Sequence, residues 1–149
     1  MAQPKSGKVF AKVGDWEIRK FPTYCVAKIG FEGDRGLRIY SGADSFSFGF
    51  MGPGTATVPA KTNVTYWFDN TKANKFTRAG VKRANVNEDG GAPWLILVDK
   101  PSEPSFAGDF ELSKSITFTY RADGAQQSET FSLKNAAAAM GKVFACSGQ

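Results

Sequence analysis

Apolar and polar side chains alternate along most of this chain, which is typical of β-strands. The plainest example is Phe46, Phe48 and Phe50, which are separated by Ser47 and Gly49. Three rings on one strand face bury a large apolar area, each contributing about 1.5–3 kcal/mol when fully covered. We therefore expect this run in the hydrophobic core, with an aromatic platform for a sugar or a peptide as the alternative.

Turn-forming residues separate the alternating runs, as at Gly14-Asp15 and Asp123-Gly124. The unbroken apolar run from Pro93 to Val98 is short enough for a strand that is buried on both faces. Strands are expected at residues 8–13, 16–20, 24–31, 37–41, 45–50, 55–58, 63–68, 75–86, 93–98, 116–120 and 128–133. Because most connections are turns, antiparallel pairing is favoured over βαβ units.

Two segments favour a helix. Within residues 101–115, Phe106 and Phe110 have helical spacing, and residues 136–144 have high helix propensity after Asn135, which is expected to cap that helix. The apolar stripe expected on the second helix consists of Ala136, Met140, Val143 and Phe144. The predicted fold is therefore mainly β: an antiparallel β-sandwich or barrel-like domain with one or two short helices, the last at the C-terminus.

The length of the chain and its apolar content indicate one folded domain. The chain has 149 residues, of which 42% are hydrophobic, so it can bury a substantial core. It contains no internal repeat, linker or low-complexity tract, and no stretch approaches the ~20 apolar residues of a membrane span. We expect residues 1–7 to be a flexible lead-in and residues 8–149 to form a single β-rich domain.

The chain contains no histidine, which restricts its chemistry. Histidine is the commonest general base and metal ligand, and it completes the usual Ser-His and Cys-His nucleophile pairs. Pairs of carboxylates are the remaining route to hydrolysis, but nearly all of them sit at predicted turns or beside glycine. The pairs are Asp15/Glu17, Glu32/Asp34, Glu88/Asp89 and Asp109/Glu111. We expect no enzymatic activity, no metal and no cofactor.

Charge and exposed aromatic residues suggest where a partner could bind. The formal charge is +5, from 19 basic and 14 acidic residues, and no nucleic-acid motif accompanies it, so nucleic acid is not expected as a partner. Because Tyr66, Trp67 and Phe68 are consecutive, a strand must point Trp67 away from the other two. The candidate binding surface for a protein or a glycan consists of Trp67, Lys72, Lys75, Arg78 and Trp94. The alternative is that both faces of these strands are buried.

The two cysteines, Cys25 and Cys146, stand near opposite ends of the chain and belong to no close-spaced metal or redox motif. They are either two buried thiols in a cytosolic protein or one disulfide in an exported protein. The disulfide is the favoured interpretation. It would close a loop of more than a hundred residues and stabilise the fold by about 3–5 kcal/mol, and it would persist only in an oxidising compartment.

The order of elements in the last third of the chain resembles a known family. Phe131-Ser132-Leu133-Lys134-Asn135-Ala136 leads into an Ala-rich helix that closes with Cys146, and Trp16 precedes Cys25-Val26-Ala27 by nine residues. These features resemble small exported proteins of alphaproteobacteria related to the invasion-associated locus B family. The resemblance implies an exported β-sandwich-like domain with a bound C-terminal helix and a Cys25–Cys146 pair. It supplies no catalytic residues.

Three hypotheses about function follow. The first is a non-enzymatic exported domain, periplasmic or secreted, that binds a protein or a glycan through an aromatic and basic surface. The second is a structural or assembly subunit, such as an envelope or virion component, whose apolar patches contact other subunits. The third is a small hydrolase that uses a pair of carboxylates. The sequence leaves the oligomeric state open.

Overall fold

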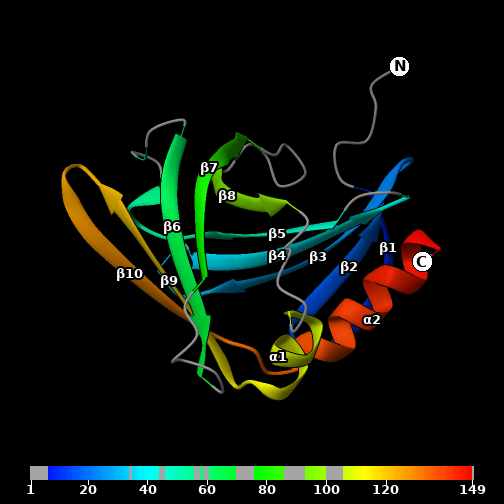
Figure 1. Cartoon of the computed structure of the whole chain (residues 1–149). Helices are drawn as coiled ribbons and strands as arrows, with labels where there is room; N and C mark the ends of the chain where they lie inside the picture. The colour runs from blue at the N-terminus through cyan, green and yellow to red at the C-terminus, as the bar shows by residue number, and fades with distance from the viewer. Residues whose placement is uncertain are drawn as a thin grey trace.

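A computed structural model of the chain describes residues 7–33, 35–43, 46–55, 58, 61–69, 76–85, 93–99 and 106–148 (Figure 1). Only the backbone is described at 61–62, 76–85, 93–99 and 106–107. The described strands are β1 Lys8–Val13, β2 Trp16–Lys20, β3 Tyr24–Phe31, β4 Arg35–Gly42, β5 Phe46–Met51, β6 Lys61–Phe68, β7 Phe76–Asn85, β8 Pro93–Asp99, β9 Ser115–Ala122 and β10 Ala125–Ser132. The helices are α1 Phe106–Leu112 and α2 Ala136–Ser147. Of the expected lead-in, residues 1–6 lie outside the described residues.

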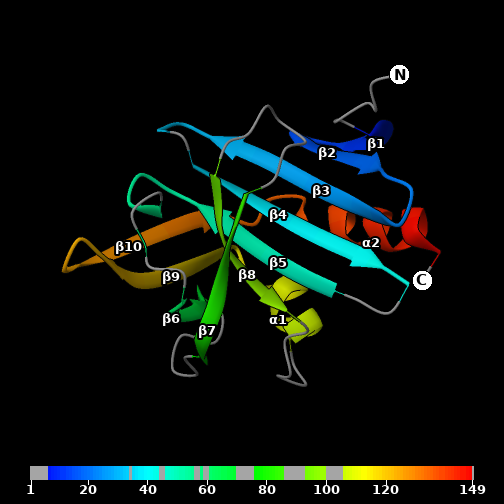
Figure 2. The ribbon, with the colours of Figure 1, turned by 90° about the horizontal axis from the view of Figure 1, so that it is seen from above.

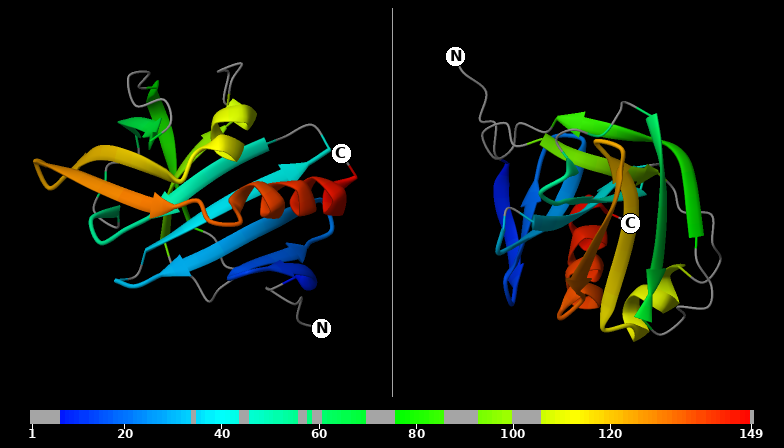
Figure 3. Two further views of the ribbon diagram at one scale, coloured as in Figure 1. Left: turned by 90° about the horizontal axis from the view of Figure 1, so that it is seen from below. Right: turned by 90° about the vertical axis from the view of Figure 1, so that its left-hand side faces the viewer.

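The strands form one continuous antiparallel sheet that bends into two layers. Its order is β1-β2-β3-β4-β5-β8-β7-β6-β9-β10. The first layer is β1–β5, the second layer is β6, β9 and β10, and the pair β7–β8 joins them (Figures 1 and 3). The expected mainly β, antiparallel architecture with a C-terminal helix is confirmed.

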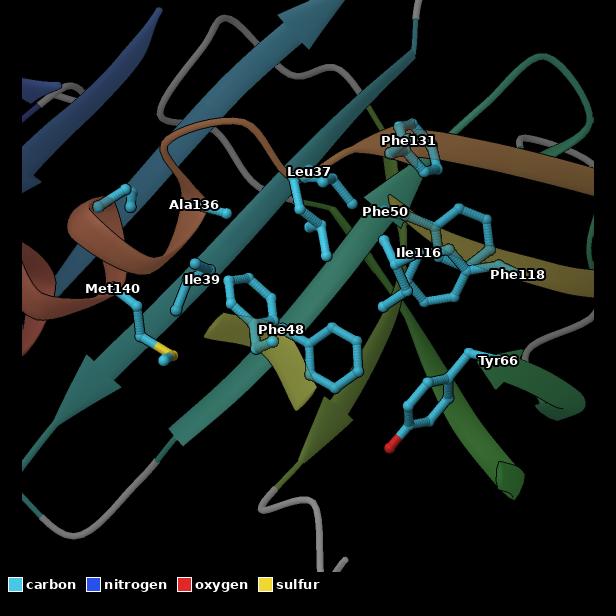
Figure 4. Close-up of a cluster of buried hydrophobic side chains, with 14 of the residues drawn as sticks. Leu37, Ile39, Phe48, Phe50, Tyr66, Ile116, Phe118, Phe131, Ala136 and Met140 are labelled. Carbon is cyan, nitrogen blue, oxygen red and sulfur yellow. The ribbon is translucent and has the colours of Figure 1, made fainter. Parts of the chain in front are cut away.

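Aromatic rings from the two layers meet in the core (Figure 4). Phe50 of β5 stacks on Phe118 of β9 with ring centroids 4.0 Å apart, and Phe48 meets Tyr66 of β6 edge-on at 5.3 Å. Phe48 and Phe50 are buried, while Phe46 is half-buried against α2. The alternation in β5 therefore builds core, as the sequence predicts.

Helix α2 covers the inner side of the first layer and is fastened at both ends (Figures 1 and 2). Before its first turn, the indole N–H of Trp16 donates to the carbonyl of Lys134 at 3.1 Å. In its last turn, Cys146 forms a disulfide with Cys25 of β3, so the favoured interpretation of the two cysteines is confirmed. The buried side chains of α2 are Ala136, Ala139, Met140, Val143 and Cys146.

Asn135 occupies the N-cap position of α2, but its side chain makes no capping hydrogen bond. Its φ of 63° is left-handed, and its side chain lies against Gly14 in the β1–β2 turn. A Cβ on Gly14, whose φ is 57°, would lie 2.3 Å from Asn135 Nδ2. The expected side-chain cap is wrong, because the left-handed backbone turns the Asn135 amide toward that turn.

Thr55 and Val58, the described ends of the strand expected at residues 55–58, are not part of a strand. The backbone N–H of Thr55 donates to the carbonyl of Gly52 at 3.1 Å, and the Thr55 hydroxyl donates to the same carbonyl at 2.7 Å. Residues 56 and 57 lie outside the described residues. The Thr55 hydroxyl completes a local turn, which competes with strand pairing for the same backbone groups.

Candidate functional site

Trp67 points away from the core, as the alternation in β6 predicts. Tyr66 and Phe68 are both fully buried, whereas Trp67 between them is half-buried on the outer side of the second layer. Its backbone is paired with Thr117 of β9. Strand β6 thus places two of its three consecutive rings in the core and the third on the outer side.

The rest of the sequence-predicted surface is only partly placed. Lys72 and Lys75 lie outside the described residues. Arg78 and Trp94 lie on β7 and β8, where the structure gives the backbone and pairs them with Val64 and Ala84 respectively. Trp67 is therefore the member of that set from which a site can be built.

The neighbours of Trp67 that the structure describes on the outer side of the second layer are hydroxyl side chains. Every outward position of β9 from residue 115 to 119, and of β10 from residue 128 to 132, is serine or threonine. We call the following set the hydroxyl face: Thr65, Trp67, Ser115, Thr117, Thr119, Ser128, Thr130 and Ser132. Figure 3 shows the three strands that carry it.

Strand register aligns these side chains in rows across the layer. Thr65 of β6 stands opposite Thr119 of β9, which stands opposite Ser128 of β10. In the next row Thr117 lies between Trp67 and Thr130, and the hydroxyls of Thr117 and Thr130 are 2.9 Å apart.

The turn between β9 and β10 sets this register. Asp123 and Gly124 both have positive φ, at 53° and 77°, which is the geometry of a two-residue type I′ hairpin turn. The sequence carried the signal for the hydroxyl face in this turn and in the Ser/Thr positions that alternate on either side of it. The alternation predicted the core correctly, but the polar positions between the core residues were not predicted as a site.

The buried side of β10 is clamped to the first layer by Arg35 of β4. Arg35 Nε donates to Glu129 Oε1 at 3.0 Å, and its terminal nitrogen donates to the carbonyl of Thr130. The guanidinium also lies over the Phe131 ring, 4.6 Å from its centroid. These contacts hold the strand that carries three of the eight residues of the hydroxyl face, so they support the face from its buried side.

Tyr120 lies on the buried side of β9, behind the hydroxyl face. Burial raises the pKa of the Tyr120 phenol to about 12, and the negative charge of Glu129 acts in the same direction. The phenol therefore stays neutral at physiological pH, so the interior beneath the face gains no second negative charge.

A hollow of about 410 Å³ opens beside the disulfide, and both cysteines help to line it. Lys20, Phe21 and Tyr24 stand on its walls, so this is a place where the fold brings rings and a lysine together. The two rings stack on each other with centroids 4.8 Å apart. Because each ring already covers one face of the other, the hollow offers a partner less free aromatic surface than its composition suggests.

Among the acidic residues considered for hydrolysis, Asp15 and Glu17 line one hollow of about 320 Å³, together with Lys28 and Arg35. Glu17 is paired with Arg19 at 2.6 Å, and Asp34, Glu88 and Asp89 lie outside the described residues. No group of three or more cysteine, aspartate or glutamate side chains that could hold a metal occurs among the residues that are described. Neither described helix has the length and apolar character needed to cross a membrane.

Comparisons of the chain with protein-family models, with curated proteins and with solved structures found no match. The Cys25–Cys146 disulfide is consistent with an oxidising, extracytoplasmic location.

Proposed function

We propose that this protein is an extracytoplasmic binding domain without catalytic machinery of its own, whose partner docks on the hydroxyl face around Trp67. The observation that carries the proposal is the uncharged array of hydroxyl side chains in register around an outward tryptophan. Such a surface offers hydrogen-bond donors and acceptors beside an aromatic body, which is what recognition of another molecule requires.

Export of the protein, to the periplasm or to the medium, belongs to the same proposal. The disulfide supports it, because such bonds persist in oxidising compartments. The resemblance of the C-terminal third to exported alphaproteobacterial proteins of the invasion-associated locus B type supports it as well. Its predictable consequence is that Cys25 and Cys146 resist alkylation in protein taken from its native compartment.

The test compares two substitutions of large outward side chains. Trp67→Ala removes the ring of the hydroxyl face, and Leu112→Ala removes a side chain that is 71% exposed at the end of α1. Both variants and the wild type are applied to immobilised neutral polysaccharides, anionic polysaccharides and native extracytoplasmic proteins. We expect Trp67→Ala alone to lose retention, and equal retention of all three proteins on every matrix would refute the proposal.

A second candidate function is assembly through the edge strand β1. Val9 and Phe10 are adjacent there and are 48% and 45% exposed. Two features of the same strand oppose pairing at this edge. Lys8 and Lys12 flank the apolar pair, and the register shifts between Val9 and Ala11. Light scattering with size exclusion decides: a stable oligomer that Phe10→Ser dissociates supports assembly, and a monomer at all concentrations excludes it.

A further inference from the structure

We infer that the ligand of the hydroxyl face is an uncharged, extended polysaccharide that lies flat across β6, β9 and β10, with one sugar ring stacked on Trp67. The inference rests on the proposed function and names its ligand class. It follows from three properties of the face: its lack of charge, its hydroxyl groups and its flat strand geometry.

The absence of charge indicates a neutral ligand. From residue 115 to 119 on β9, and from residue 128 to 132 on β10, no outward side chain is charged. Binding of nucleic acid or of an anionic polymer depends on clustered Lys and Arg. The residues of the hydroxyl face include no Lys or Arg, and Arg121 lies beyond the end of the face. Among the described side chains of this face, a polyanion would therefore find no counter-charge.

Hydroxyl groups suit a ligand that is itself a polyol. Each serine or threonine hydroxyl can donate one hydrogen bond and accept two, and a sugar hydroxyl has the same capacity. Thr117 and Thr130 already stand at hydrogen-bonding distance, 2.9 Å, so their remaining capacity faces outward in a fixed arrangement. The Trp67 ring can pack against the C–H side of a pyranose, which hydroxyls alone cannot engage.

The same composition argues against a protein partner at this face. Binding energy in protein interfaces comes mainly from buried Trp, Tyr and Arg, whereas Ser and Thr are under-represented among the residues that dominate affinity. The hydroxyl face offers one large ring, Trp67, with hydroxyl side chains around it. A protein interface of ordinary size, about 800 Å² on each side, would need more apolar anchors than this.

The shape of the site indicates an extended chain and not a single sugar. From Ser115 to Thr119, outward side chains span about 13 Å along β9, and the three strands span about 10 Å across. The described side chains of the hydroxyl face thus form an extended area on three adjacent strands. A polymer gains affinity on such a surface because several of its units bind at once.

The experiment measures retention of the folded, oxidised protein on insoluble cellulose, chitin, xylan and mannan, with heparin-agarose as the anionic matrix. The variants are Trp67→Ala, Thr117→Val and Thr130→Val, and Thr23→Val in an exposed loop is the matched control. Thermal melting confirms that each variant is folded. We expect retention on at least one neutral matrix, a loss of about thirtyfold for Trp67→Ala and about twofold to tenfold for each Thr→Val variant. Thr23→Val should bind like the wild type.

Two results overturn the inference in different ways. In the first, heparin or an extracytoplasmic protein retains the wild type, Trp67→Ala abolishes this retention, and no neutral matrix retains the protein. That result defeats the polysaccharide inference and leaves the proposed binding face intact. Retention that no variant on the hydroxyl face alters, on any matrix, defeats both. Loss of retention on a neutral matrix for Trp67→Ala and Thr130→Val, but not for Thr23→Val, supports both.

Discussion

The outer sides of the two layers are both polar, but different side chains make them so. In the first layer the polar positions of β2 and β3 carry charges, including Glu17, Arg19 and Lys28. In the second layer the corresponding positions carry hydroxyls, with Trp67 among them. Both arrangements keep an antiparallel sheet polar toward water and apolar toward the core.

The difference shows that the hydroxyl face is not required by the fold. Charged residues make one side of a strand soluble, as they do in β2 and β3 of the same sheet. From residue 115 to 119 of β9 and from 128 to 132 of β10, the second layer instead carries no outward charge, and β6 adds Trp67 beside these positions. This difference supports the proposal that the hydroxyl face binds a partner.

The largest expected effect concerns the first layer, where α2 is tied down covalently. The double variant Cys25→Ala, Cys146→Ala should lower the free energy of unfolding by about 4–5 kcal/mol, because the bond joins residues 121 apart. Chemical denaturation measures this loss. The control is Ser147→Ala, in the same helical turn as Cys146. It removes one hydroxyl contact with Ser41 of β4 and should cost about 1 kcal/mol. Equal costs for the two would mean that the bond adds nothing.

Inside the second layer, adjacent residues of β9 should behave oppositely. Phe118 touches rings from three other strands, so Phe118→Ala should cost about 3–5 kcal/mol through the cavity it leaves. Thr117→Val, one residue away and outward, should change stability by less than about 0.5 kcal/mol. Urea unfolding of both variants checks the contrast, and a comparable loss in Thr117→Val would show that the outer side is a structural layer.

The clamp between the layers should have an intermediate effect. Arg35→Met leaves the buried carboxylate of Glu129 without its ion-pair partner, which should cost about 2–3 kcal/mol. The double variant Arg35→Met, Glu129→Gln should recover part of this loss, because no charge is then left behind. Failure of the second change to restore any stability would indicate that the Arg35 contacts with Phe131 and the Thr130 carbonyl matter more than the charge.

Tyr120 makes the second layer sensitive to alkaline pH. Its folded-state pKa of about 12 lies above the unfolded value near 10, so the unfolded chain releases this proton first. Stability from this group is complete below pH 10 and falls by about 2 kcal/mol between pH 10 and 12. Tyr120→Phe should lack that component, and thermal melting of both proteins across this range checks it. Parallel curves would exclude Tyr120 as the cause.

The smallest expected effect compares the two outer sides directly. The Glu17–Arg19 pair is partly exposed, so Glu17→Gln should cost about 0.2–1 kcal/mol at low salt and almost nothing in 1 M salt. Thr130→Val on the hydroxyl face should show no dependence on salt. Unfolding at two ionic strengths distinguishes them, and salt-dependent stability in Thr130→Val would contradict the neutral character of that face.

The strands, their turns and the burial of the Phe46–Phe50 run were predictable because strand alternation and turn residues are local properties. The turn at Asp123-Gly124 even contains the register of the β9–β10 hairpin. The position of β6 beside β9 was not predictable, since 48 or more residues separate the paired positions and no local pattern links them. Without that pairing, Trp67 has no visible relation to Thr117.

The sequence by itself determined that the chain folds as an antiparallel β domain, that it has no imidazole for catalysis or metal binding, and that Trp67 faces away from its neighbouring rings. Tertiary structure alone decided that Cys25 reaches Cys146, that Asn135 packs on the β1–β2 turn, and that hydroxyls from three strands align around one indole. The physical reason is the range of the interactions. Alternation and turn chemistry act over a few residues, whereas strand order depends on which apolar faces the whole chain can bury together.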